Sequence, residues 1–146
     1  VPPDHGILLD GAPRKTEQQD LLTEVLGGLG KKVDLILVTD ATFETSMRNI
    51  VGRMVCRKCE FPYHEIYRPT ANPGVCDFCP GVPVEKRDDD SPRGVEARWK
   101  TFHTDTIPVI EAYQRMGVPI RKINANGTAS EVWQSVVRAL EETRQP

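Results

Sequence analysis

The four cysteines of this 146-residue chain lie close together in the sequence, as two Cys-x-x-Cys pairs. Sixteen residues separate Cys56 and Cys59 from Cys76 and Cys79. Each pair can turn two thiolates toward the same ion, and four thiolates in tetrahedral geometry form a closed structural zinc site. We therefore expect a metal-binding knuckle that holds shape and performs no catalysis, with zinc or iron as the metal. Four reduced structural cysteines are the alternative.

The charge balance around the cysteines argues against a ribbon that binds nucleic acid. Residues 53–90 carry six Lys or Arg and seven Asp or Glu, and the formal net charge of the chain is −2. A reader of a phosphate backbone needs an excess of cationic side chains. No apolar run approaches the roughly 20 residues of a membrane span, and no signal peptide opens the chain. We expect a cytoplasmic protein that binds neither nucleic acid nor membrane.

Arginines bracket the cysteine segment. Arg53 precedes it, Arg87 follows it, and Arg98 lies further along the chain. Arginines where a small subdomain joins its core indicate a hinge that closes over an anionic ligand. Solvated surface charges are the alternative interpretation.

Asp10 and Arg14 offer a second indication of a phosphate ligand. Asp10 ends an apolar run, and ligand sites in parallel sheets lie just beyond the carboxyl ends of the strands. An acidic side chain there can orient hydrated Mg²⁺ on nucleotide phosphates, and Arg14 could bind a phosphate directly. An ordinary turn residue is the alternative for Asp10.

The elements that must position these residues alternate between strands and helices. Apolar runs predict buried strands over residues 6–10 and 33–38, and we expect residues 118–125 to form a third strand. Apolar residues at helical spacing predict helices between and after these strands, including a long one bent at Pro108. Three helix starts carry capping residues: Thr16 with Gln19, Ser91 before Pro92, and Thr128 with Glu131.

The cysteine segment interrupts this alternation and lacks helical periodicity, and its prolines suit short strands and turns. The predicted fold is therefore an α/β core that carries an inserted metal-binding subdomain. We expect residues 1–53 and 88–146 to form the core and residues 54–87 to form the insertion.

Five segments, in family order, resemble adenylate kinases: "GILLDGAPRKTEQQ", "LGKKVDLILV", "IVGRMVCRKC…CDFC", "KRDDDSPRGVEARW" and "INANGTASEV". The resemblance runs from about Gly6 to Leu140 and is to the zinc-bearing bacterial type, in which four cysteines hold the lid. It implies a nucleoside monophosphate kinase of the P-loop class, with a parallel-sheet core and a small zinc-ribbon lid. It also implies conversion of ATP and AMP to two ADP, Mg²⁺ with ATP, structural zinc in the lid, and a monomer for a complete chain.

The resemblance further implies roles for individual residues. Those implied for phosphoryl transfer are Asp10, which orients the Mg²⁺ water shell, and the arginines Arg53, Arg87 and Arg98. Those implied for AMP are Gly11, Ala12, Pro13, Arg14 on its phosphate, Gln18 on its adenine, Arg87 and Arg98. Those implied for ATP are Arg53, Pro62, Tyr63 and Ala129. The metal ligands are Cys56, Cys59, Cys76 and Cys79. Asp89 and Asp90 match the paired acids at the family's lid hinge.

The sequence departs from the family pattern in several places. Ala12 replaces a usual Phe, and Asn49 and Met54 stand where arginines are common. No Gly-x-x-x-x-Gly-Lys-[Ser/Thr] loop occurs, so we expect an incomplete core that matches the C-terminal two-thirds of an adenylate kinase. A start at Val1 without Met also suggests processing or truncation. We expect negligible turnover from this chain alone. The alternatives are a non-catalytic nucleotide-binding or structural remnant and a zinc-ribbon interaction module.

Overall fold

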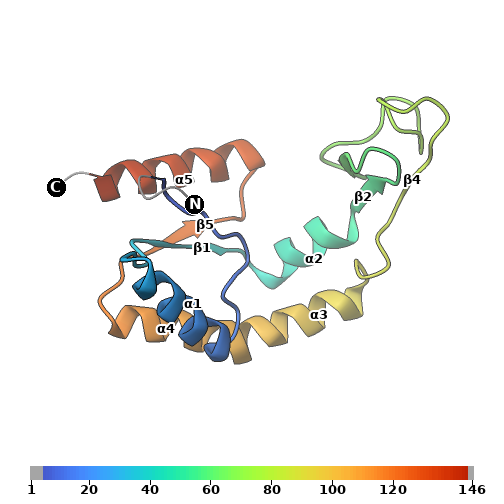
Figure 1. Ribbon diagram of the computed structural model, residues 1–146. Coiled ribbons are helices and arrows are strands. Elements are labelled where there is room, and N and C mark those ends of the chain that lie inside the picture. The colour runs from blue at the N-terminus through green and yellow to red at the C-terminus, as the bar shows by residue number, and fades with distance from the viewer. Residues whose placement is uncertain (1–4, 145–146) are drawn as a thin grey trace. The chain divides into compact units, whose positions relative to one another are not determined.

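The computed structural model describes residues 5–144, and the chain divides into two compact units (Figure 1). The first unit combines the chain up to Thr39 with the chain from Lys100 onward, and the second is Asp40–Trp99. Within residues 5–144, no helix combines the length and apolar character that crossing a membrane requires.

The first unit is a mixed α/β structure. Its helices are α1 (Thr16–Gly28), α4 (Ile107–Arg115) and α5 (Ala129–Arg144), and its strands are β1 (Ile36–Asp40) and β5 (Ile120–Asn124). The two strands pair in a parallel sheet, as expected for the fold class predicted from the sequence. The buried apolar side chains of this unit come from the three helices and β5: Leu26, Val109, Tyr113, Ala139 and Ile123.

The prediction that residues 6–10 form a strand is wrong. These residues form no strand, and the side chains of Ile7, Leu8 and Leu9 are 42%, 92% and 47% exposed. A strand forms only where a neighbour accepts and donates its backbone hydrogen bonds. Among the described residues no strand pairs with this segment, so its apolar pattern alone does not make it part of the sheet.

The helix starts show which capping predictions hold. Ser91 Oγ accepts from Gly94 N at 3.1 Å, and Thr128 and Glu131 form the predicted capping box, with Thr128 N donating to Glu131 Oε2 at 2.7 Å. The prediction for α1 is shifted by one residue. Gln18, not Gln19, accepts from the backbone at the helix start, and Gln19 is buried instead.

The long helix predicted after Ser91 is divided into three parts. The α-helix α3 (Pro92–Thr101) is followed by a single π-helical segment, η1 (Phe102–Thr106), and then by α4. Pro108 stands next to this irregular turn and has no N–H to donate to the carbonyl four residues earlier. Such wider turns are typical where the regular hydrogen-bond ladder of a helix is interrupted.

The second unit holds the cysteine segment. Helix α2 (Phe43–Val51) is capped by Thr42, whose Oγ1 accepts from Thr45 N at 3.1 Å. Gly52 then leads into β2 (Arg53–Cys56), which pairs antiparallel with β3 (Pro62–His64) and β4 (Val84–Glu85). The three short strands, in the order β3-β2-β4, form a small sheet around the cysteines. We call the segment from β2 through β4 the lid.

Candidate functional site

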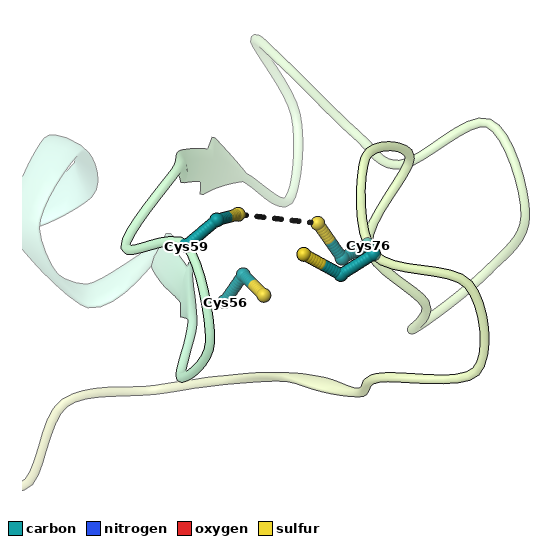
Figure 2. A group of neighbouring side chains, drawn as sticks. Cys56, Cys59 and Cys76 are labelled. Carbon is teal, nitrogen blue, oxygen red and sulfur yellow. Dashed lines mark hydrogen bonds between the residues drawn. The ribbon is translucent and has the colours of Figure 1, made fainter.

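The four cysteines converge in the lid. Cys56 ends β2, Cys59 lies in the turn after it, and the loop between β3 and β4 supplies Cys76 and Cys79. One sulfur from each lies within 4.8 Å of all the others. Figure 2 shows Cys59 and Cys76 pointing toward each other, with their sulfurs 3.7 Å apart. Cys59 is exposed, whereas Cys56, Cys76 and Cys79 are buried.

The geometry of the cluster fits one tetrahedral metal ion. A zinc–sulfur bond of about 2.3 Å gives sulfurs about 3.8 Å apart along the edge of a tetrahedron. The 3.7 Å between Cys59 and Cys76 matches that edge and far exceeds the roughly 2.05 Å of a disulfide bond. The cluster can therefore hold a metal with four thiolates, as predicted from the spacing.

Tyr63 lies inside the lid beside the metal ligands. The residue is 2% exposed, and its hydroxyl lies 3.4 Å from Cys76 Sγ. Burial and the hydrogen bond to Cys76 raise the pKa of Tyr63 to about 12. Burial opposes ionisation of Cys76, but hydrogen bonds from the Tyr63 hydroxyl and the Phe78 N–H outweigh it and lower the pKa of Cys76 to about 6. A thiolate at neutral pH is the form that a metal ligand requires.

Cys79 lies in a different environment. Burial is the main cause that raises the pKa of its thiol to about 12, and the neighbouring thiols Cys59 and Cys56 raise it further. Four sulfurs this close repel each other as thiolates unless a cation lies between them. The donor set thus suits a divalent ion that would offset this repulsion.

Asp90 is buried and gathers two of the predicted phosphate-binding arginines. Its carboxylate accepts from Arg53 Nε and Nη2 at 2.7 and 2.6 Å, and from Arg98 Nη1 at 3.4 Å. The Asp90 side chain has no exposed surface, and that of Arg53 is 36% exposed. Hydrogen bonding from Arg53 holds the pKa of Asp90 below its ordinary value despite burial, and Asp90 raises the pKa of Arg53. Both groups are therefore charged at neutral pH.

Asp89 extends this cluster to the third arginine. Arg87 Nε donates to Asp89 Oδ1 at 3.2 Å, and Arg98 Nη2 donates to Asp89 Oδ2. The structure thus brings Arg53, Arg87 and Arg98 together around two acids, at the points where the chain enters and leaves the lid. We call these five residues the arginine cluster. Three guanidinium groups against two carboxylates leave it an excess of positive charge.

The turn predicted to bind AMP lies in the first unit. Gly11 has φ +67°, a conformation that favours glycine, and an added Cβ would lie 2.6 Å from the Arg14 guanidinium. Arg14 Nε donates to the Gly11 carbonyl at 2.6 Å, which closes the turn. Gln18 Oε1 accepts from Arg14 N and Lys15 N at 2.8 and 3.2 Å. The Ala12–Pro13 peptide between them is cis.

The remaining predicted site residues are placed as follows. Asp10 is exposed beside the turn, and Ala129 is the first residue of α5. In the lid, Pro62 is exposed and begins β3, whereas the side chain of Tyr63 is turned into the core. Tyr63 as a whole residue is 2% exposed, so of these two residues Pro62 is the one that lies at the surface of the lid.

Two features were missed from the sequence. The hydroxyl of Tyr63 contacts a predicted metal ligand, and Asp90 is buried in an ion pair with Arg53. A signal for the ion pair was present, since three consecutive acids, Asp88 to Asp90, stand just before Ser91 and the helix that carries Arg98. No signal in the sequence pointed to the contact of the Tyr63 hydroxyl with Cys76, because only the pairing of β2 with β3 brings Tyr63 toward the cysteines.

Comparison with known proteins defines the class first. Residues 53–89 match the family model described as "Adenylate kinase, active site lid". The mixed α/β structure with a parallel sheet is consistent with a truncated nucleotide kinase core, and the four clustered cysteines fit a zinc-binding lid.

Curated adenylate kinases are similar to most of this chain. An adenylate kinase of Caldicellulosiruptor saccharolyticus is 34% identical over 136 residues, which are 93% of this chain and 62% of the relative. Adenylate kinases of Streptomyces avermitilis and Pyrococcus furiosus are 37% and 35% identical over 137 residues, covering 61% of each relative and 93% and 94% of this chain. The chain is homologous to adenylate kinases, which confirms the resemblance. It spans about 62% of the length of the first of these relatives.

Proposed function

We propose that this chain supplies the lid, the AMP-binding turn and the adenine-side helix of an adenylate kinase, which converts ATP and AMP to two ADP with Mg²⁺. The observation that carries the proposal is the arginine cluster at the base of a lid that matches the active-site lid of adenylate kinases. Arg53, Arg87 and Arg98 would stabilise the phosphoryl group in transfer.

The chemistry of phosphoryl transfer favours this assignment. The transferred group spreads negative charge over its oxygens, so a catalyst mainly supplies alignment and positive charge. Arg53 already holds a carboxylate through two parallel N–H donors, at 2.6 and 2.7 Å. The same fork fits two oxygens of a phosphate. In the proposed closed state phosphate oxygens would take up donors of the cluster, and the lid would exclude water that could otherwise accept the phosphoryl group.

On the AMP side, the proposal assigns the phosphate to Arg14 and the adenine to Gln18. Because Gln18 Oε1 caps α1, its amide nitrogen is the group that would donate to the adenine ring. Gly11, Ala12 and Pro13 would shape the turn around the nucleotide. Asp10 would orient the water shell of Mg²⁺, which would bridge and neutralise the ATP phosphates.

On the ATP side, the proposal assigns Arg53 to the phosphates and takes Pro62 and Tyr63 as the lid segment beside ATP. A backbone group of Ala129 would contact the adenine. The lid metal would be zinc, held by the four cysteines, and it would serve structure only. The same proposal takes residues 54–87 as the lid proper, residues 1–53 and 88–146 as core, and a cytoplasmic monomer as the form of a complete kinase.

A chimera tests the proposal directly. The first third of the C. saccharolyticus adenylate kinase would be fused to this chain, since the resemblance places the family's phosphate-binding loop in the part of the relatives that precedes the match. We expect Mg²⁺-dependent ADP formation from ATP and AMP. Arg98→Lys should lower turnover by about 100-fold or more, because one guanidinium of this kind contributes several kcal/mol in the transition state.

The matched control is Arg57→Lys, which alters a lid arginine that is paired with Glu85 outside the arginine cluster, at 2.5 Å. This variant should retain turnover. If the chimera binds ATP and AMP but produces no ADP, the alternative of a non-catalytic nucleotide-binding remnant replaces the proposal.

A further inference from the structure

The Tyr63 hydroxyl makes two hydrogen bonds inside the lid. It accepts from Asp77 N at 2.8 Å, and it lies 3.4 Å from Cys76 Sγ. Because the oxygen accepts from Asp77, its own proton is left to donate, and the Cys76 sulfur is the acceptor at hydrogen-bonding distance. When Cys76 is a thiolate, as a metal ligand must be, the hydroxyl is the only one of the two groups with a proton to donate, and it donates O–H to the sulfur.

The position of Tyr63 makes this contact a fixed one. Its ring is buried, pairs across the sheet with Met54, and meets the ring of Phe61 edge to face at a centroid distance of 5.2 Å. The hydroxyl thus connects a strand on one side of the cysteine cluster with the loop that carries Cys76 on the other. An exposed tyrosine would gain little from such a bond, because water would satisfy its hydroxyl equally well.

We propose that Tyr63 is part of the metal site, where its hydroxyl stabilises the Cys76 thiolate as a ligand and fixes the loop at Asp77 that leads to Cys79. The inference rests on the cluster holding a divalent metal and does not depend on kinase activity. Four thiolates around one divalent ion leave a net charge of about −2 in a largely buried site. An O–H dipole directed at one sulfur offsets part of that charge and orients the ligand.

The proposal also assigns a role to the side chain of a residue that the family resemblance places beside ATP. The exposed Pro62 would face the nucleotide, while the buried Tyr63 side chain would hydrogen-bond a metal ligand. A metal ion in the lid would thereby hold the ATP-facing strand β3 in place.

Metal competition with the Tyr63→Phe variant of this chain tests the inference. The substitution removes the hydroxyl and keeps the ring, so the sulfur and the Asp77 N–H lose their partner without a cavity forming. Cobalt(II) bound to four thiolates has intense charge-transfer bands. Zinc titrated into the cobalt-loaded protein displaces the cobalt, and the loss of these bands gives the affinity for zinc relative to that for cobalt. We expect the variant to bind zinc about 10- to 100-fold more weakly than the wild type.

Tyr67→Phe is the matched control, because Tyr67 is 57% exposed and stacks on His64 rather than on the cysteines. Its metal affinity should equal that of the wild type. At saturating cobalt, Tyr63→Phe should show the same tetrahedral spectrum as the wild type, which establishes that its lid is folded. A folded variant with unchanged zinc affinity would overturn the proposal.

A second measurement covers the case in which Tyr63→Phe takes up no metal. In the zinc-loaded wild type, the Tyr63 hydroxyl proton should be protected from exchange with water and give a nuclear Overhauser effect to the Asp77 amide proton. A hydroxyl proton in rapid exchange with water, without that contact, would refute the hydrogen bond on which the inference depends.

Discussion

At the scale of single residues, Asp90 is the carboxylate on which the arginine cluster depends. Asp90→Asn removes the charge that pairs with Arg53 and Arg98 but keeps the shape of the side chain. We expect the free energy of unfolding of the lid to fall by about 1–3 kcal/mol, less than for a fully buried pair because Arg53 is partly exposed. Urea denaturation followed by tyrosine fluorescence would measure it.

Glu65→Gln provides the control for Asp90→Asn. It removes one carboxylate from an exposed ion pair, in which Lys86 Nζ lies 2.9 Å from Glu65 Oε1 and both side chains are about half exposed. Such pairs contribute about 0–1 kcal/mol. Equal losses in the two variants would show that Asp90 is an ordinary surface acid.

Acid should remove the contribution of Asp90 to the free energy of unfolding. Hydrogen bonds from Arg53 lower the pKa of Asp90 below its ordinary value of 3.8, so the stabilisation is fully present above about pH 5. It is lost as the pH falls through the lowered pKa of the folded state, because protonation then discharges the carboxylate. The difference in unfolding free energy between wild type and Asp90→Asn should therefore be constant from about pH 7 to 5 and shrink below about pH 3.8.

Comparing the two proteins at each pH cancels the effect of acid on the cysteines, which both share. A difference that increased on acidification would contradict the ionised, arginine-bound state of Asp90.

At the scale of elements, Gly52 joins α2 to β2 at a point where a side chain does not fit. An added Cβ would lie 2.5 Å from the Cε1 and Nε2 atoms of His64. His64 holds this junction, since its Nε2 donates to the Arg48 carbonyl at 3.2 Å and its Nδ1 accepts from Ile66 N and Tyr67 N at 3.1 and 3.2 Å. Gly52→Ala should cost about 1–3 kcal/mol of unfolding free energy by displacing the imidazole.

The cause can be isolated with a double-mutant cycle. If the clash with His64 is responsible, Gly52→Ala should cost much less in a His64→Ala background. Gly27→Ala is the control, because no atom lies within 4 Å of a Cβ at that position and it is helical. It should be neutral or slightly stabilising. An equal cost of Gly52→Ala in both backgrounds would exclude His64 as the cause.

The elements also show how far the sequence predicts this structure. Local signals located two helix starts, since Ser91 and Thr128 with Glu131 are found where predicted, but the start of α1 is shifted by one residue. They failed for residues 6–10, because an apolar run cannot reveal whether a partner strand is present. In the site, fixed spacing predicted the cysteine cluster, whereas the Asp90 ion pair and the Tyr63 contact depend on pairing between distant segments. Such tertiary contacts leave no periodic trace in the sequence.

At the scale of the whole molecule, we expect the lid to depend on a metal for its folded state. The lid has a small core, formed mainly by the cysteines themselves with Tyr63 and Val84, so the metal–sulfur bonds replace much of the apolar burial that a larger core would provide. We expect one zinc per chain. Chelation should unfold the lid and expose the Tyr63 ring, and Cys76→Ser should lower the thermal midpoint by about 10 °C or more.

Metal analysis of the purified protein, with thermal unfolding followed by circular dichroism before and after chelation, measures both effects. Readdition of zinc should restore the wild-type midpoint. A protein that carries no metal after gentle purification, or a Cys76→Ser variant with an unchanged midpoint, would contradict a metal-held lid.

The most direct test of the kinase proposal is ADP formation from ATP and AMP, measured in a coupled assay with Mg²⁺. The 146-residue chain alone should give negligible turnover, because no phosphate-binding Gly-x-x-x-x-Gly-Lys-[Ser/Thr] loop occurs in it. The chimera with the first third of the C. saccharolyticus adenylate kinase should turn over, and Arg98→Lys should lower that turnover about 100-fold or more. Robust turnover by the chain alone, or a chimera whose turnover is indifferent to Arg98→Lys, would contradict the account.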